Sequence, residues 1–366
     1  MFKKTAEKVW WGIPCLIRAQ QGSFKVVCSI FDKNHDQAPK GEKLTGSNKL
    51  LFFAIAEDLD ENYNNVRIVV QKLKLSEIKC CYAADLKLIN CLLGISSHSG
   101  KHACPFCEGE MSLEVGQLRT FGNLNFWHNK LKEDAEKSRN PESFIKRNMK
   151  NYMNVVNECM LRGDPETTIL STIPLPELHL LMGTVNWALV LIYKRVDKDN
   201  LQRRMRTKSI TVHGYHGGGL DGGNSMQFLN ELDFVFETLP EELEPVYTML
   251  SRFRTVVKGC FGMELSSTFR EDIDEFKISV VNLLQYAHEV LKTKFEPTWK
   301  VHILYAHLKP FLEEKMVGLG IFCEQTSESA HCIAKPTQKR FKRRSDHKDH
   351  GKNLSRAACD LTAKAM

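Results

Sequence analysis

The chain has 366 residues, of which 42% are apolar and 26% are charged, and its formal net charge is +7. This length and composition allow a substantial buried core and exclude an intrinsically disordered protein, and no stretch approaches the roughly twenty apolar residues that a membrane-spanning helix needs. The twelve cysteines fall at irregular intervals and no signal peptide is evident, which favours a reducing compartment.

The N-terminal part of the chain predicts strands. Residues 9–17, 22–31 and 49–56 are short runs rich in β-branched and aromatic residues, bounded by turn residues. Residues 62–75 predict a helix, because their valines recur at helical spacing. Residues 78–84 then predict a fourth strand, buried on both faces and ending at Asp85, before a helix over 86–93. This order favours an α/β core with helices packed on a mixed sheet.

The rest of the chain predicts helices, beginning after about residue 112. Apolar patterns of helical period cover residues 142–161, 178–196, 224–236, 241–260, 272–294 and 299–315. Another helix is predicted over 324–341, preceded by Gly318 and Gly320. An all-helical block is therefore expected inside an α/β frame.

A basic segment follows. Residues 335–352 hold eight lysines and arginines against two aspartates, so most of the net charge lies there. Such a segment suits contact with phosphates or nuclear targeting, although a solvated tail has the same composition.

Asp85 is a candidate ligand for a catalytic metal. An acid at the carboxyl end of a central strand stands at the edge where α/β folds place catalytic groups, and paired carboxylates bind Mg²⁺ or Mn²⁺. Asp85 is equally suited to cap the helix predicted to begin at Leu86.

Two pairs of residues match the halves of a Cys2His2 zinc site. Cys104 and Cys107 flank Pro105-Phe106, and His302 and His307 have four residues between them. A zinc ion bound by both pairs would anchor a large inserted domain at its root. The alternative is two buried small side chains and two ordinary helix histidines. Other candidate ligands, whose spacing fits less well, are His98, His102, Cys80 and Cys81.

Two further motifs carry possible chemistry. Glu324 and Glu328 lie four residues apart on one predicted helical face, where one of them suits a third metal ligand and a solvated face is the alternative. Residues 216–224 are dense in glycine, so backbone amides there can approach a phosphate. The Gly-Lys-Ser/Thr ending of a nucleotide-binding loop is absent, so we expect no nucleotide cofactor, and a flexible turn before a helix is the alternative.

Taken in order, these motifs resemble the DDE transposases of the Transib type, which have an RNase H-like fold with a helical insertion and include the catalytic subunit of the V(D)J recombinase. The resemblance covers nearly the whole chain, and each shared motif is short. The shared features are Asp85 nineteen positions before Cys104, the Cys104 and Cys107 pair, Pro176-Glu177-Leu178-His179 with Gly183, the turn at 216–224, His302 with His307, and residues 324–331 followed by the basic residues 339–344.

The resemblance implies a cut-and-paste DNA recombinase. Asp85 would be the second catalytic aspartate and Glu328 the catalytic glutamate, both binding Mg²⁺, with Glu324 as the alternative one turn away. Cys104, Cys107, His302 and His307 would hold a structural zinc ion. His179 would lie near the reacting phosphate, although it is equally suited to pack on Leu180 and Leu181. The residues expected to touch DNA are Gly217, Gly218, Asn224, Lys339, Arg340, Arg343 and Arg344.

The sequence departs from this family at the first catalytic aspartate. The turn before the second strand reads Ile17-Arg18-Ala19-Gln20-Gln21-Gly22 and has no acid, while Asp32 and Asp36 come only after that strand. Loss of one carboxylate removes a bridging ligand from a two-metal site, so we expect strand cleavage to be impaired. We also expect this chain to lack the N-terminal DNA-binding region of a working transposase.

The sequence therefore predicts an RNase H-like mixed sheet interrupted by a zinc-anchored helical insertion. The expected divisions are a core over 1–100, an insertion over 101–315, a closing helix over 316–345 and a basic tail over 346–366. The expected function is that of a nuclear, transposase-derived DNA-binding protein, impaired as a nuclease, which would dimerise if it follows the family. An active Mg²⁺-dependent transposase and a decayed transposon relic remain alternatives.

Overall fold

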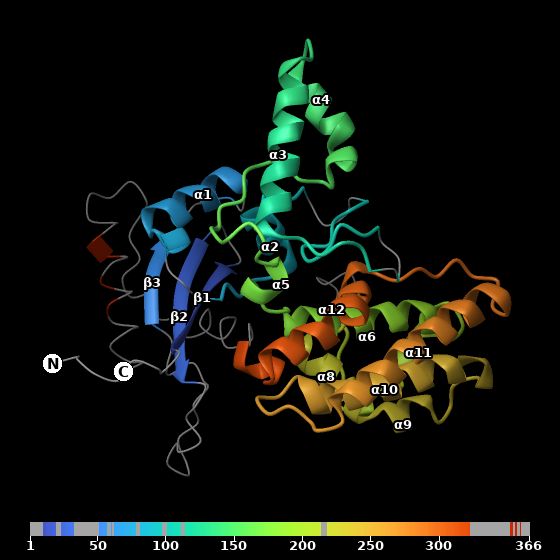
Figure 1. Ribbon diagram of the computed structural model, residues 1–366. Helices are drawn as coiled ribbons and strands as arrows, with labels where there is room; N and C mark the ends of the chain where they lie inside the picture. Colours follow the sequence, from blue (N-terminus) through green and yellow to red (C-terminus); the bar gives the residue numbers. More distant parts are fainter. Residues whose placement is uncertain are drawn as a thin grey trace. The chain divides into compact units, whose positions relative to one another are not determined.

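The structure is a computed structural model whose described residues form helices, three strands and irregular connections (Figure 1). It describes residues 10–19, 23–32, 51–56, 60, 62–77, 81–96, 101–110, 113, 115–213 and 218–322, and the isolated positions 352, 353, 356 and 359. The chain falls into two compact units. Unit 1 comprises residues 1–100, 119–176 and 322–366, and unit 2 comprises residues 101–118 and 177–321. The region expected to form one insertion is thus divided, since residues 119–176 group with unit 1.

The sheet of unit 1 has three antiparallel strands in the order β1-β2-β3 (Figure 1). These are β1 (Trp10–Ala19), β2 (Ser23–Asp32) and β3 (Leu51–Ala56). Cys15 pairs with Val27 between the first two strands, and the register between the second and third shifts at Val26/Val27. The strands predicted over 9–17, 22–31 and 49–56 are confirmed where the structure describes them.

The expected RNase H-like mixed sheet is wrong. All strand pairs of the described residues are antiparallel, and most of the described elements are helices. Of the fourth strand predicted over 78–84, residues 81–84 lie outside any strand and residues 78–80 lie outside the described part. Tyr82 is nonetheless buried, and its backbone N–H donates to the carbonyl of Thr172 at 3.2 Å. The apolar run is therefore a buried irregular segment. A buried irregular segment and a core strand can have the same apolar pattern, and periodicity alone does not distinguish them.

Two short helices of unit 1 follow the sequence pattern closely. Helix α1 (Tyr63–Lys72) buries Val66, Val69 and Val70 and is capped by Asn62, whose side chain accepts from the N–H of Asn65. A single 3-10 turn, η2 (Leu75–Glu77), leads to α2 (Leu86–Leu92). The helices predicted over 62–75 and 86–93 are therefore confirmed.

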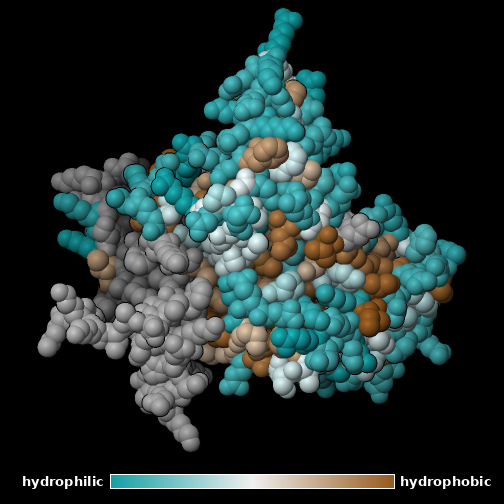
Figure 2. Space-filling model, in the orientation of Figure 1, coloured by the Kyte–Doolittle hydropathy of each residue, from teal (hydrophilic) through white to brown (hydrophobic). Residues whose placement is uncertain are grey.

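A helical hairpin forms a second part of unit 1 (Figure 1). It consists of α3 (Phe121–Glu136), α4 (Pro141–Asn148) and the 3-10 turn η3 (Met149–Tyr152), and α5 (Ile169–Thr172) comes later. The helix predicted over 142–161 is too long, because Met153 and Asn154 adopt left-handed backbone angles with φ of 51° and 60°. Figure 2 shows mainly hydrophilic residues over the hairpin, which is consistent with a solvated element.

Unit 2 is mainly a bundle of helices. The helices are α6 (Glu177–Tyr193), α7 (Lys198–Thr207), α8 (Gly222–Asn230), α9 (Leu232–Phe236), α10 (Glu244–Cys260), α11 (Phe269–Glu289) and α12 (Trp299–Lys315). The turn η5 (Glu241–Leu243) precedes α10, and η6 (Leu319–Phe322) follows α12. Five of the predicted helices are confirmed, whereas α3, α5 and α7 were not predicted. No described helix is both long and apolar enough to cross a membrane.

The core of unit 2 centres on α10 and α11, which pack side by side (Figure 1). Phe253 on α10 is fully buried, with its ring centroid 5.4 Å from that of Phe276 and 6.1 Å from that of Phe261. The segment after α12 closes on the segment after α10 through a backbone contact. A Cβ at Gly318 would lie 2.1 Å from the carbonyl oxygen of Gly262, so this approach requires glycine.

Candidate metal centre

The first half of the centre is a tight turn formed by Cys104-Pro105-Phe106-Cys107. The backbone N–H of Phe106 donates to the Cys104 sulfur at 3.4 Å, which bends the chain so that both sulfurs lie on one side. Cys107 then pairs with Leu118 in an isolated antiparallel bridge, and Glu108 N–H donates to the carbonyl of Gln117 at 2.8 Å. The turn is therefore held by backbone hydrogen bonds within its own segment.

The second half lies on α12. His302 and His307 are fully buried on this helix, which begins after Thr298, whose side chain accepts from the N–H of Val301. Aromatic rings flank both imidazoles: Trp299 lies 5.4 Å from His302 and Phe106 lies 5.6 Å from His307, measured between ring centroids. These contacts limit the rotation of the two histidines and position their Nε2 atoms toward the cysteines.

The two halves meet at one point within unit 2. The Cys104 sulfur lies 3.4 Å from Nε2 of His307, and the Cys107 sulfur lies 3.4 Å from Nε2 of His302. All four ligand atoms lie within 4.8 Å of one another, and all four residues are buried. Tetrahedral zinc with bonds of about 2.3 Å to sulfur and about 2.0 Å to nitrogen places its ligand atoms roughly 3.5 Å apart. The cluster can thus hold a metal ion such as zinc, as the sequence predicted.

The electrostatics of the cluster also suit a cation. Burial and the neighbouring Cys107 raise the pKa of Cys104, while the hydrogen bond from Cys104 lowers the pKa of Cys107. The pair therefore favours one thiol and one thiolate, and a divalent cation would take the place of the shared proton. Burial lowers the pKa of His307, which favours the neutral imidazole that binds metals.

The competing ligands of the sequence lie elsewhere where they are described. His102 is buried, and its Nδ1 lies 2.8 Å from the carbonyl oxygen of Glu108, so this histidine supports the cysteine turn. Cys81 is a buried residue of unit 1 and does not belong to the cluster. His98 and Cys80 lie outside the described residues.

Asp85 caps a helix. Its Oδ1 accepts from the backbone N–H of Leu88 at 2.7 Å, at the start of α2. Glu328 and Glu324, the carboxylates expected beside it, lie outside the described residues, as do Lys339, Arg340, Arg343 and Arg344.

Substitution of Asp85 tests the capping role. We expect Asp85→Ala to lower the free energy of unfolding by about 1 kcal/mol, because one helix N–H loses its acceptor. Asp85→Asn keeps an oxygen acceptor and should remain close to the wild type. Urea unfolding followed by circular dichroism measures both variants. Equal stability of Asp85→Ala and the wild type would exclude a stabilising cap.

His179 and the glycine turn both belong to unit 2. His179 is half-buried on the first turn of α6. Gly217 lies outside the described residues, whereas Gly218 has a φ of 82°. Asn224 holds the turn together: its Oδ1 accepts from the N–H of Thr211 at 2.6 Å, and its Nδ2 donates to Asp221 at 2.9 Å. The side-chain amide of Asn224 thus forms hydrogen bonds within the turn.

Comparison with known proteins adds no assignment. Neither a scan against models of protein families nor a search of the curated proteins gives a match.

Proposed function

We propose that this chain is a transposase-derived DNA-binding protein whose Cys2His2 cluster holds a structural zinc ion. The observation that carries the proposal is the cluster of Cys104, Cys107, His302 and His307, which have the order and spacing of the recombinases that the sequence resembles. The sheet does not support the proposal, because the strands that the structure describes pair only antiparallel and do not form the mixed sheet of those enzymes. The basic segment at residues 335–352 supports a nuclear location and DNA as the partner.

A structural role for the zinc follows from the ligands. Four protein donors complete a tetrahedral shell and leave no open position for a water or a substrate. All four residues are buried, so a bound ion would be shielded from solvent. Catalytic zinc sites keep an exchangeable position, which this cluster does not offer.

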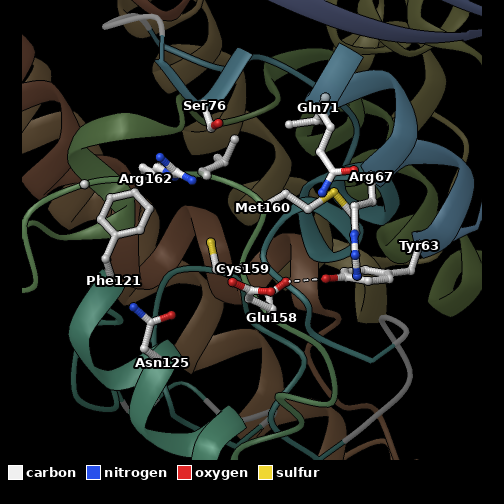
Figure 3. Close-up of a pocket in the computed structure, with 13 residues that line it drawn as sticks. Tyr63, Arg67, Gln71, Ser76, Phe121, Asn125, Glu158, Cys159, Met160 and Arg162 are labelled. Atoms are coloured by element: carbon white, nitrogen blue, oxygen red, sulfur yellow. Dashed lines mark hydrogen bonds between the residues drawn. The ribbon is translucent and has the colours of Figure 1, made fainter. Parts of the chain in front are cut away.

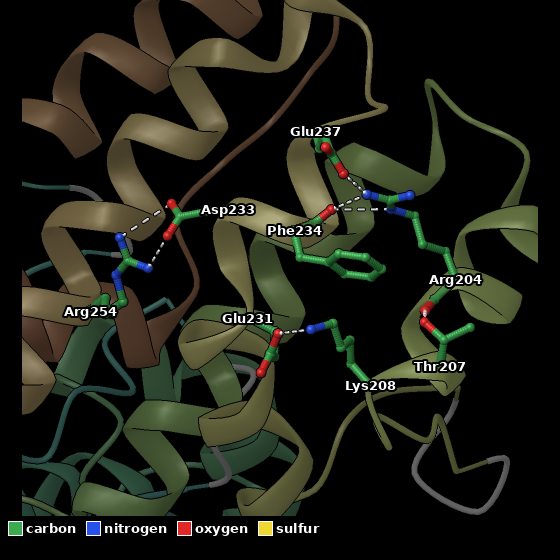
Figure 4. A network of polar contacts seen from close by, with 8 residues as sticks. All are labelled: Arg204, Thr207, Lys208, Glu231, Asp233, Phe234, Glu237 and Arg254. Carbon is green, nitrogen blue, oxygen red and sulfur yellow. Dashed lines mark hydrogen bonds and ion pairs between the residues drawn. The ribbon is translucent and has the colours of Figure 1, made fainter.

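Exposed basic residues on α7 support a contact with DNA beyond those that the sequence predicted. Figure 4 shows that Arg204 and Lys208 are engaged inside unit 2, at 2.7 Å from Glu237 and 2.9 Å from Glu231, respectively. Arg203 and Arg206, by contrast, are exposed and form no ion pair with the described residues. The basic residues over 203–208 are visible in the sequence. Only the structure shows which of them form ion pairs within unit 2 and which are exposed.

Lys198 connects this basic face to the glycine turn. Its Nζ lies 3.6 Å from the position that a Cβ of Gly218 would occupy, and 5.2 Å from the ring centroid of Tyr193. A cation beside the backbone of a glycine turn is a typical arrangement for phosphate contact. We therefore include Lys198, Arg203 and Arg206 with the basic segment in the proposed DNA-binding surface.

No strand cleavage is included in the proposal. The turn over 17–22 has no acid, and one oxygen of Asp85 already caps α2. Binding to DNA depends on phosphate contacts and needs none of these carboxylates.

The salt dependence of DNA binding tests the proposal. We expect a 30-base-pair duplex to bind with an affinity that falls steeply between 50 and 200 mM salt. Neutralisation of Lys339, Arg340, Arg343 and Arg344 to glutamine should flatten the slope of log K against log salt by about 0.9 for each phosphate that the variant no longer neutralises. The triple variant of Lys198, Arg203 and Arg206 should behave similarly. Fluorescence anisotropy across a salt series measures the slopes.

A charge-matched control separates specific contacts from net charge. It replaces four exposed lysines with glutamine, at positions Lys72, Lys150, Lys258 and Lys292. We expect this control to keep the wild-type slope. An identical loss in the control and in the tail variant would contradict an assigned surface, and the absence of salt-dependent binding by the zinc-loaded wild type would contradict the proposed function.

A further inference from the structure

Unit 1 contains a cleft that the proposed function leaves unused (Figure 3). Its volume is about 400 Å³, and it lies between α1, the start of α3 and the loop over 158–163. Small-molecule sites typically have volumes of about 300–1,000 Å³. The cleft is therefore large enough for a phosphorylated sugar and too large to be filled by a single inorganic ion.

The walls of the cleft are tied together by direct contacts. The hydroxyl of Tyr63 on α1 donates to the carbonyl of Glu158 at 2.8 Å, which joins the helix to the loop. A Cβ at Gly163 would lie 2.3 Å from the ring of Phe121, so the loop packs closely on the start of α3. Gly122 N–H also donates to the carbonyl of Pro165 at 2.8 Å. The cleft thus has a defined shape without a ligand.

Two arginines give the cleft a net positive character. Figure 3 shows Arg67 and Arg162 on different sides of the cleft. Both are exposed, and neither forms an ion pair with a carboxylate among the described residues, while Arg67 also hydrogen-bonds to the side chain of Tyr63. A guanidinium without a carboxylate partner is well suited to a phosphate, because its planar donors match two phosphate oxygens.

The remaining lining suits hydroxyl groups. Gln71, Ser76, Asn125 and Glu158 supply amide, hydroxyl and carboxylate oxygens that can accept from a sugar. The apolar lining residues Val70, Phe121, Met160 and Leu161 are almost fully buried, so they offer little surface for an apolar ligand. Polar groups therefore dominate the recognition that the cleft can provide.

We propose that this cleft binds a phosphorylated pentose, with the phosphate at Arg162 and the sugar hydroxyls facing Glu158 and Asn125. The same chemistry has two sources, a free pentose phosphate and the 5′-phosphorylated end of a DNA strand. Neither source depends on the zinc cluster or on the basic residues of unit 2.

Titration calorimetry with four probes tests the proposal. The probes are ribose 5-phosphate, ribose, a 5′-phosphorylated duplex and the same duplex without the phosphate. We expect ribose 5-phosphate to bind and ribose not to bind. If the phosphorylated duplex binds more tightly than the unphosphorylated one, the DNA end is the source, and equal affinity for the two duplexes assigns the cleft to the free sugar. Absence of both ribose 5-phosphate binding and a 5′-phosphate effect would overturn the proposal.

A variant pair localises the binding. Arg162→Gln should weaken ribose 5-phosphate binding by at least about tenfold, because a charged hydrogen bond is removed. Arg139→Gln removes an exposed arginine of unit 1 that does not line the cleft, and should bind as the wild type does. Equal weakening in both variants would overturn the assignment.

Cys159 provides a second readout inside the cleft. This residue is half-buried, lines the cleft and has a pKa that burial raises to about 12, so its reaction with a maleimide should be slow. Ribose 5-phosphate should slow the labelling of Cys159 further in the wild type and not in Arg162→Gln, as followed by peptide mass spectrometry. Unchanged labelling of wild-type Cys159 at saturating ligand would place the binding elsewhere and overturn the proposal.

Discussion

Cys107→Ser is expected to abolish stoichiometric zinc binding and to lower the stability of unit 2 by about 3 kcal/mol or more. The variant leaves Cys104, His302 and His307 buried without the metal ion that all four ligands would share. Each buried polar group without a partner costs about 1–3 kcal/mol. For a unit of this size, the thermal midpoint should fall by about 6–12 °C, since each kcal/mol shifts it by about 2–4 °C.

The reason for this large effect lies in what the cluster connects. Cys107 and His302 lie 195 positions apart in the sequence, and the four metal ligands, together with the contact of Phe106 with His307, join the cysteine turn to α12. Structural zinc in small domains contributes about 10–16 kcal/mol of binding free energy at neutral pH. Unit 2 also has an apolar core of its own, so we expect partial destabilisation and not complete unfolding.

Zinc content and thermal unfolding measure the effect together. Native mass spectrometry of the wild type should give about one zinc per chain, and a strong chelator should lower the thermal midpoint to that of Cys107→Ser. His302→Ala should behave like Cys107→Ser. The matched controls are Cys91→Ser, a half-buried cysteine outside the cluster, and His288→Ala, an exposed histidine of α11. Wild-type zinc content in Cys107→Ser would show that the four residues do not form the site.

The metal cluster could be predicted from the sequence because each half is local. Two cysteines with two residues between them form a turn whose backbone brings the sulfurs together, and two histidines on one helix lie within about one and a half turns. The meeting of the halves depends on the path of α6 to α11 between them. No periodic pattern encodes that path, so the prediction relied on ligand chemistry and on resemblance.

Helices with continuous apolar faces were predicted, and helices with interrupted faces were missed. In α10 the buried residues include Val246, Met249, Leu250 and Phe253, a regular helical pattern. Helix α7 buries only Leu201 and Met205 in ten residues, and its remaining positions are polar. The signal that could have identified α7 is its start, where Asp197 accepts from the N–H groups of Asp199 and Asn200.

The fold class was wrong because burial was interpreted as strand. Residues 81–84 are apolar and almost fully buried, as a central strand would be, yet they form no strand. The residue after this segment, Asp85, had a correct alternative interpretation as a helix cap. Asp85 precedes α2 and caps it, since its Oδ1 accepts a hydrogen bond of 2.7 Å from the N–H of Leu88. A local signal, the cap, was thus more reliable than the long-range inference of a sheet.

Phe253→Ala should destabilise unit 2 by about 3–5 kcal/mol, because it removes a fully buried ring and leaves a cavity between α10 and α11. The expected fall in the thermal midpoint is about 6–20 °C. Phe253→Leu keeps most of the volume and should lose clearly less stability. Ile278→Ala on α11 is the matched control, since this side chain is 61% exposed and its removal should change stability by no more than about 0.5 kcal/mol.

The zinc content of Phe253→Ala separates two explanations of metal loss. Phe253 does not belong to the cluster, so the folded variant should still bind about one zinc per chain below its lowered thermal midpoint. Zinc loss in Cys107→Ser then reflects the missing ligand, because Phe253→Ala at comparable destabilisation retains the metal. If Phe253→Ala also loses its zinc while circular dichroism shows it folded, the four residues depend on the core packing of α10 and α11 for their convergence. Metal binding would then depend on the packing of unit 2 as well as on the four ligands.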